Sequence, residues 1–206
     1  MALSTLEVAV QRVGAKARNT SIKGLDYGGI PALKALLVID MLKGFIREQE
    51  KPIIPKIAKL IQAFREAKLP VIYICDSHLP GDKEFELWGP HALRGSPEAE
   101  VVDELKPAEG DYIVYKRRYT GFYATDLDLL LRELGVDEVV VCGIYTEYCV
   151  KHTVADAFFH NYKVTVVKDC ISSYEEQFQE FMIDYMSKAY GAKIESLEKV
   201  ISSLKT

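Results

Sequence analysis

The chain has 206 residues, of which 49% are hydrophobic and 27% are charged, a length and balance that suit one globular α/β domain with a sizeable core. Its net charge of −4, with lysine and arginine dispersed along the chain, gives no electrostatic reason to expect nucleic-acid binding, which usually requires a basic face. No apolar run approaches the roughly 18 residues of a membrane span, and polar residues interrupt the first apolar stretch, so we expect a soluble, cytoplasmic protein with neither nucleic-acid nor membrane partners.

The first thirty residues differ from the rest of the chain. Residues 4–7 (STLE) resemble a capping box that opens an amphipathic helix, and three glycines and Pro31 break the chain after it. We therefore expect an N-terminal helical extension over residues 1–30, packed on the domain or on a neighbouring subunit of a homo-oligomer, and a single main domain over residues 31–206.

From residue 35 onward, short apolar runs alternate with longer segments of helical period, a pattern typical of a parallel sheet covered on both faces. It predicts a three-layer, Rossmann-type α/β fold with a mostly parallel sheet of five or six strands. The expected strands are 35–39, 71–75, 112–115, 138–142, 163–167 and a short 193–194. The expected helices are 54–67, 127–134, 149–159 and 175–190, with a terminal helix capped by Ser196.

The carboxyl ends of parallel strands meet at one edge of the sheet, where ligands bind. Reactive side chains follow nearly every predicted strand: Asp40, Asp76, Lys116, Asp169 and, after the loop 143–148, the thiol of Cys149. We expect these groups to face one crevice. The connection 77–110 is too long for an ordinary crossover, and such long excursions are usually functional.

Cys149 is predicted to begin a helix, where the helix dipole and a nearby Lys116 would lower the pKa of its thiol. It could equally be a small buried residue like Cys75, Cys142 and Cys170, which look like reduced thiols rather than a disulfide framework. Taken singly, Asp40 could be a cap or a metal ligand, and Lys116 a solvated charge.

Three blocks carry a family resemblance: residues 37–41 (LVIDM), 116–122 (KRRYTGF) and 143–150 (GIYTEYCV). Their order and spacing resemble the signature of the isochorismatase-like cysteine hydrolases, and the nicotinamidase/pyrazinamidase branch is the closest well-known relative. The likeness runs from about residue 35 to residue 194.

This resemblance implies a catalytic triad of Asp40, Lys116 and Cys149, in which the sulfur attacks an amide carbonyl and forms a thioester. It also implies a cis peptide bond between Ile144 and Tyr145, with the backbone amides of Tyr145 and Cys149 forming the oxyanion hole.

The same resemblance implies a divalent metal in the long connection. Asp76, His78 and His91 would be ligands, with Glu84 at a position where the family often has another His or Glu. Zinc is the expected metal, and iron or manganese would also suit these donors.

The resemblance further gives Phe45 and Trp88 the positions that sandwich a flat substrate ring, and the bulky Tyr145 would narrow the pocket. His152 and His160 are expected to pack or lie on the surface. Leu42 and Gly44 depart from the Gln and Asp usual in nicotinamidases, which puts the ring specificity in doubt.

We therefore expect an amidohydrolase of a small-molecule amide, with nicotinamide as the best single guess and an N-carbamoyl or other linear amide as the near alternative. Isochorismate cleavage is disfavoured, because the branch that performs it typically lacks the cysteine. Two other classes stay open: an idle binding or assembly module, and a redox-active thiol protein with Cys142 or Cys170 as resolving partner.

Overall fold

The computed structural model describes residues 33–205, and the expected helical extension over residues 1–30 lies outside this described part. Six strands form one parallel sheet in the order β3-β2-β1-β4-β5-β6. They are β1 (Leu33–Ile39), β2 (Val71–Asp76), β3 (Tyr112–Lys116), β4 (Val136–Ile144), β5 (Lys163–Ser172) and β6 (Lys193–Glu195). The predicted parallel α/β sheet is confirmed.

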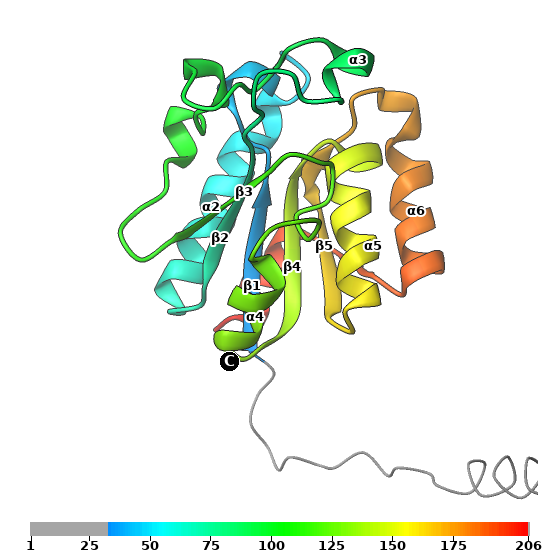
Figure 1. Cartoon of the computed structure of the whole chain (residues 1–206). Helices are drawn as coiled ribbons and strands as arrows, with labels where there is room; N and C mark the ends of the chain where they lie inside the picture. Colours follow the sequence, from blue (N-terminus) through cyan, green and yellow to red (C-terminus); the bar gives the residue numbers. More distant parts are fainter. Residues whose placement is uncertain (1–32, 206) are drawn as a thin grey trace, which may run out of the picture. The chain divides into compact units, whose positions relative to one another are not determined.

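Helices cover both faces of this sheet (Figure 1). One face carries α2 (Ile54–Glu66) and α7 (Leu197–Ser203), and the other carries α4 (Leu127–Glu133), α5 (Lys151–Phe159) and α6 (Gln179–Tyr190). Alternate residues of β1 point into the two cores: Leu36 and Val38 pack with α2, while Leu37 and Ile39 pack on the opposite side. The central strand is therefore apolar on both faces, as its unbroken apolar run predicts.

Two predicted helices begin differently from expectation. The segment before α5 is a π-helical turn, Thr146–Val150, and a short 3₁₀ turn, Glu176–Phe178, precedes α6. At the other end α6 stops at Gly191, whose φ of 65° gives the left-handed C-cap expected of a glycine there. The Ser196 side chain accepts the Lys199 N–H at 3.3 Å, which confirms the predicted cap of α7.

Asp169 is the one expected crevice residue that the fold places elsewhere. Strand β5 does not end at residue 167 but continues to Ser172, so Asp169 lies within the strand. Its carboxylate accepts the Leu197 N–H at 2.8 Å and thereby anchors the start of α7. The prediction for Asp169 was wrong because a charged pair, Lys168 and Asp169, interrupts an apolar run without ending the strand.

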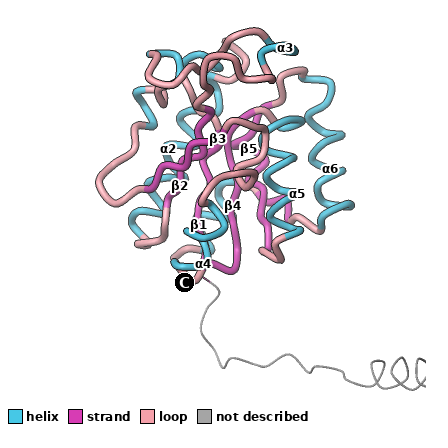
Figure 2. Tube along the Cα trace, viewed as in Figure 1, coloured by secondary structure: helices cyan, strands magenta, loops and turns pink. Residues whose placement is uncertain are grey.

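The long connection between β2 and β3 lies over the carboxyl ends of the strands and contains the short helix α3 (Phe85–Trp88) (Figure 1). Loops gather at this edge of the sheet (Figure 2). No helix within residues 33–205 combines the length and apolar character needed to cross a bilayer.

Gly143 allows β4 to approach β1 closely at this edge. It pairs with Ile39, has a φ of +114°, and a Cβ added there would lie 2.1 Å from the Ile39 carbonyl oxygen. Only glycine fits this position, which brings the end of β1 next to the turn that carries Cys149.

Candidate active site

Three side chains meet at the carboxyl-terminal edge of the sheet, each from the end of a different strand. Asp40 follows β1, Lys116 ends β3, and Cys149 follows β4. The Lys116 Nζ lies 2.7 Å from Asp40 Oδ2 and 3.5 Å from Cys149 Sγ, and all three residues are buried. Asp40 has a φ of 49°, a left-handed conformation that aspartate tolerates better than most residues, and it turns the chain sharply after the strand. The residues of the predicted triad are thus in one cluster.

Asp76 is the fourth charged member of this cluster. Its Oδ1 lies 2.5 Å from Lys116 Nζ, and its backbone N–H donates to Asp40 Oδ1 at 2.8 Å. One ammonium therefore contacts two buried carboxylates.

The turn that carries Cys149 follows the cis peptide bond between Ile144 and Tyr145. The Tyr145 carbonyl accepts the N–H groups of Tyr148 and Val150, at 3.0 and 3.2 Å, which closes the π-helical turn around Cys149. Glu147, also buried, accepts the N–H groups of Tyr174 and Glu175 and so ties this turn to the loop after β5.

Burial and the neighbouring charges shift the pKa values of Asp40 and Lys116. Burial and the negative charge of Asp76 raise the pKa of Asp40 to about 6, although Lys116 opposes the shift. Burial opposes ionisation of Lys116, yet Asp40 and Asp76 hold its pKa well above the ordinary value.

The expected lowering of the pKa of Cys149 is wrong. Burial raises the pKa of this thiol well above its ordinary value, and the charges of Asp40 and Asp76 add to the shift that Lys116 opposes. At rest Cys149 is therefore a thiol, and it lies beside Asp40, whose pKa is raised toward neutrality. Asp40 can accept the proton of this thiol.

The predicted metal ligands also converge. One ligand atom each from Asp76, His78 and His91 lies within 4.8 Å of the others. Glu84 Oε1 lies 3.9 Å from His91 Nε2.

Both imidazoles present Nε2 for coordination. His91 Nδ1 donates to the Gly89 carbonyl at 2.8 Å, and His78 Nδ1 contacts Asp82 Oδ2 at 2.9 Å. The buried Nε2 of His78 has no hydrogen-bond partner among residues 33–205. A buried ring nitrogen without a hydrogen-bond partner, 3.7 Å from Asp76 Oδ2, fits a divalent cation, and two imidazoles with carboxylates suit zinc, iron or manganese.

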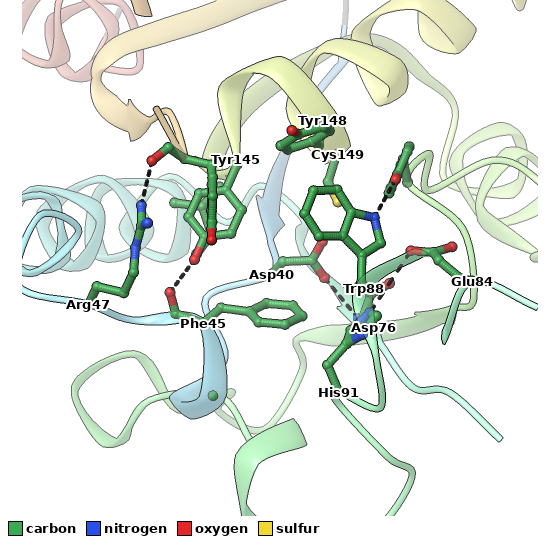
Figure 3. Close-up of a pocket in the computed structure, with 14 residues that line it drawn as sticks. Asp40, Phe45, Arg47, Asp76, Glu84, Trp88, His91, Tyr145, Tyr148 and Cys149 are labelled. Atoms are coloured by element: carbon green, nitrogen blue, oxygen red, sulfur yellow. Dashed lines mark hydrogen bonds and ion pairs between the residues drawn. The ribbon is translucent and has the colours of Figure 1, made fainter. Parts of the chain in front are cut away.

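A cavity of about 300 Å³ opens above Cys149, and six of its fourteen lining residues are Phe, Trp or Tyr (Figure 3). Phe45, Trp88 and Tyr145, the three expected substrate-binding residues, all line it. The Trp88 indole N–H donates to the Tyr119 hydroxyl at 2.7 Å, and Tyr145 donates its hydroxyl to the Phe45 carbonyl at 2.5 Å. These bonds hold the rings around the sulfur.

Gly44, which departs from the nicotinamidase pattern, lines the cavity, and so do four residues for which no role was predicted from the sequence: Arg47, Tyr119, Tyr148 and Tyr174. Tyr119 and Tyr148 lie within the family blocks and could have been singled out there, whereas Arg47 and Tyr174 had no signal. His152 is part-buried with Nδ1 against the Tyr148 carbonyl, and His160 stacks on Phe122, so neither is at the cavity, as expected.

Comparison with known proteins places this geometry in context. Residues 34–199 match the model of the isochorismatase domain. A ureidoacrylate amidohydrolase of Serratia proteamaculans is 30% identical over 207 residues, which cover 84% of each chain.

Two solved structures are similar throughout. An N-carbamoylsarcosine amidase from Thermoplasma acidophilum has 38% identity and a TM-score of 0.76, covering 80% of this chain and 96% of that one. A pyrazinamidase of Pyrococcus horikoshii, in complex with zinc, has 32% identity and a TM-score of 0.72, covering 79% and 98%.

Proposed function

The chain belongs to the isochorismatase family of hydrolases, and from this premise we propose that it hydrolyses the C–N bond of small amides with Cys149 as nucleophile. Asp40 acts as the proton carrier, and Lys116 keeps Asp40 ionised and oriented. The observation that carries the proposal is the contact of one buried ammonium with both the carboxylate and the sulfur, at 2.7 and 3.5 Å.

In the first half-reaction Asp40 accepts the thiol proton as the sulfur attacks the amide carbonyl carbon. The carbonyl π electrons move to oxygen, and the backbone amides of Tyr145 and Cys149 stabilise the oxyanion. The intermediate then collapses: its C–N bond breaks, the leaving nitrogen takes the proton from Asp40, and ammonia or an amine departs.

The second half-reaction releases the acyl group from sulfur. Asp40, ionised again, takes a proton from water as the water oxygen attacks the thioester carbon. The C–S bond breaks and the sulfur regains the proton, so that amide and water have become carboxylic acid and ammonia with the enzyme restored.

Asp76, His78, Glu84 and His91 would hold a divalent cation beside this centre. When bound, such a cation supplies a Lewis acid at the end of the cavity that these residues form. Asp76 links the two sites directly, because its carboxylate contacts Lys116 while its backbone N–H contacts Asp40.

Nicotinamide and N-carbamoyl compounds are the two substrate candidates. Phe45 and Trp88 favour a flat ring, since both line the cavity. Similarity to an N-carbamoylsarcosine amidase and to a ureidoacrylate amidohydrolase favours a carbamoyl group.

Ammonia release from nicotinamide and from N-carbamoyl amino acids tests the proposal. Wild type should turn over at least one of them, and Cys149→Ala should abolish turnover. Cys142→Ala is the matched control, because Cys142 is also a fully buried cysteine but does not line the cavity.

Mass spectrometry of the reacting enzyme should show the acyl group on the peptide that carries Cys149. Full activity of Cys149→Ala would end the nucleophile proposal. The absence of turnover across the panel, with metal supplied, would favour a binding module, and a disulfide from Cys149 to Cys142 or Cys170 under mild oxidant would favour a redox protein.

A further inference from the structure

Charge is divided unevenly along the cavity. Three carboxylates, those of Asp40, Asp76 and Glu84, line it together with one guanidinium, that of Arg47, which is its only lysine or arginine among the described lining residues. In Figure 3 Arg47 lies beside Tyr145, on the side away from Glu84. The cavity therefore has carboxylates at one end and a guanidinium at the other.

Arg47 is held in place by a buried partner. Glu50 is 0% exposed and accepts bonds from the Arg47 backbone N–H at 2.8 Å, from Nε at 3.2 Å and from Nη2 at 2.7 Å. Nη2 also donates to the Tyr174 carbonyl at 2.8 Å. Burying a carboxylate is unfavourable unless it is paired, so this contact fixes both side chains.

Two aromatic rings complete the setting. The guanidinium carbon lies 4.2 Å from the Tyr174 ring centroid and 5.3 Å from that of Tyr145. Both rings line the cavity. The guanidinium is thus restrained before any ligand arrives, which lowers the entropy lost on binding.

The restraint leaves one edge of the guanidinium unused. Nε and Nη2 are occupied, whereas Nη1 donates to no acceptor within residues 33–205. Its N–H groups are donors of the kind that a carboxylate accepts in a charge-assisted hydrogen bond.

We propose that Arg47 recognises a carboxylate on the substrate, so that the enzyme prefers small amides whose far end is anionic. This rests on the proposed amide hydrolysis. The free donor of Arg47 binds the carboxylate, so the substrate lies with its amide toward Cys149 and its anion toward Arg47. A neutral ring amide gains nothing from this contact.

The test compares N-carbamoylglycine with its methyl ester, which lacks the negative charge. Calorimetry on the Cys149→Ala protein measures binding without turnover, and kcat/KM for ammonia release is measured on the active enzyme. One charge-assisted bond predicts a preference of about 10- to 100-fold for the acid. The variant Arg47→Gln with Glu50→Gln should reduce this ratio to nearly one; changing both residues leaves no unpaired buried carboxylate.

Arg132→Gln is the control, since Arg132 is an exposed arginine that pairs with Asp128 on α4, and it should leave the ratio unchanged. Equal affinities for acid and ester, including no measurable binding of either, would overturn the role of Arg47. A preference that survives the double substitution would overturn it too. Selective binding without ammonia release would instead count against the proposed hydrolysis and leave the Arg47 site standing.

Discussion

Replacing Lys116 by methionine removes the one cation that two buried carboxylates share. The ammonium lies 2.7 Å from Asp40 and 2.5 Å from Asp76, and the three side chains are 0%, 1% and 5% exposed. Removing one partner of a buried ion pair typically costs about 3–5 kcal/mol, because the remaining charge is left without compensation. We expect Lys116→Met to lower the free energy of unfolding by about this amount.

Urea unfolding at pH 7, followed by circular dichroism in metal-free buffer, measures the change. The double variant Lys116→Met with Asp40→Asn carries one buried negative charge fewer, so it should be more stable than Lys116→Met alone. Lys188→Met, which removes a lysine 76% exposed, is the control and should leave the unfolding midpoint unchanged. A loss below about 1 kcal/mol, or no rescue by Asp40→Asn, would refute the electrostatic reasoning.

Two further substitutions test the architecture around the site. Gly143→Ala places a Cβ 2.1 Å from the Ile39 carbonyl oxygen and should lower the unfolding free energy by about 3 kcal/mol or more, as judged by urea titration. Gly110→Ala, at a φ of +94° with open space around it, should cost clearly less, and equal losses would contradict the collision. Asp82→Ala frees His78 Nδ1 and should weaken zinc binding about 10- to 100-fold in equilibrium dialysis, whereas unchanged affinity would show that Asp82 does not orient the ligand.

The position of the reactive residues followed from a rule about sheets. Asp40 and Lys116 end apolar runs, and parallel strands bring such ends to one edge whatever their separation in the sequence. Strand limits were accordingly predicted within a few residues for β1 to β4. For β5 the rule gave the wrong place for Asp169. In the sequence, two charged residues within a strand cannot be distinguished from charged residues that follow its end.

The chemistry of Cys149 could not be predicted from its neighbours in sequence. The position of Cys149 near a helix start predicts a lowered pKa from the helix dipole. In the folded protein, burial and the charges of Asp40 and Asp76 raise this pKa instead. These carboxylates arrive from two other strands, so their effect appears only once the sheet has formed.

The role of Arg47 and Glu50 at the cavity could not be predicted for a related reason. Spaced three apart, they look like an ordinary surface pair, which contributes little. The fold instead buries Glu50 completely and directs Arg47 to the cavity. Whether a charge pair is solvated or restrained depends on the packing of distant segments, which no local pattern contains.

The two carboxylates around Lys116 differ in a way that assigns them different tasks in the proposed mechanism. Burial and Asp76 raise the pKa of Asp40 to about 6, whereas Lys116 and His78 overcome burial and hold the pKa of Asp76 below its usual value. A carboxylate that stays ionised suits cation binding, and one that titrates near neutrality can both accept and return a proton. Both carboxylates are buried and both contact Lys116, so the difference comes from two other groups: His78 lowers the pKa of Asp76, and the charge of Asp76 raises the pKa of Asp40.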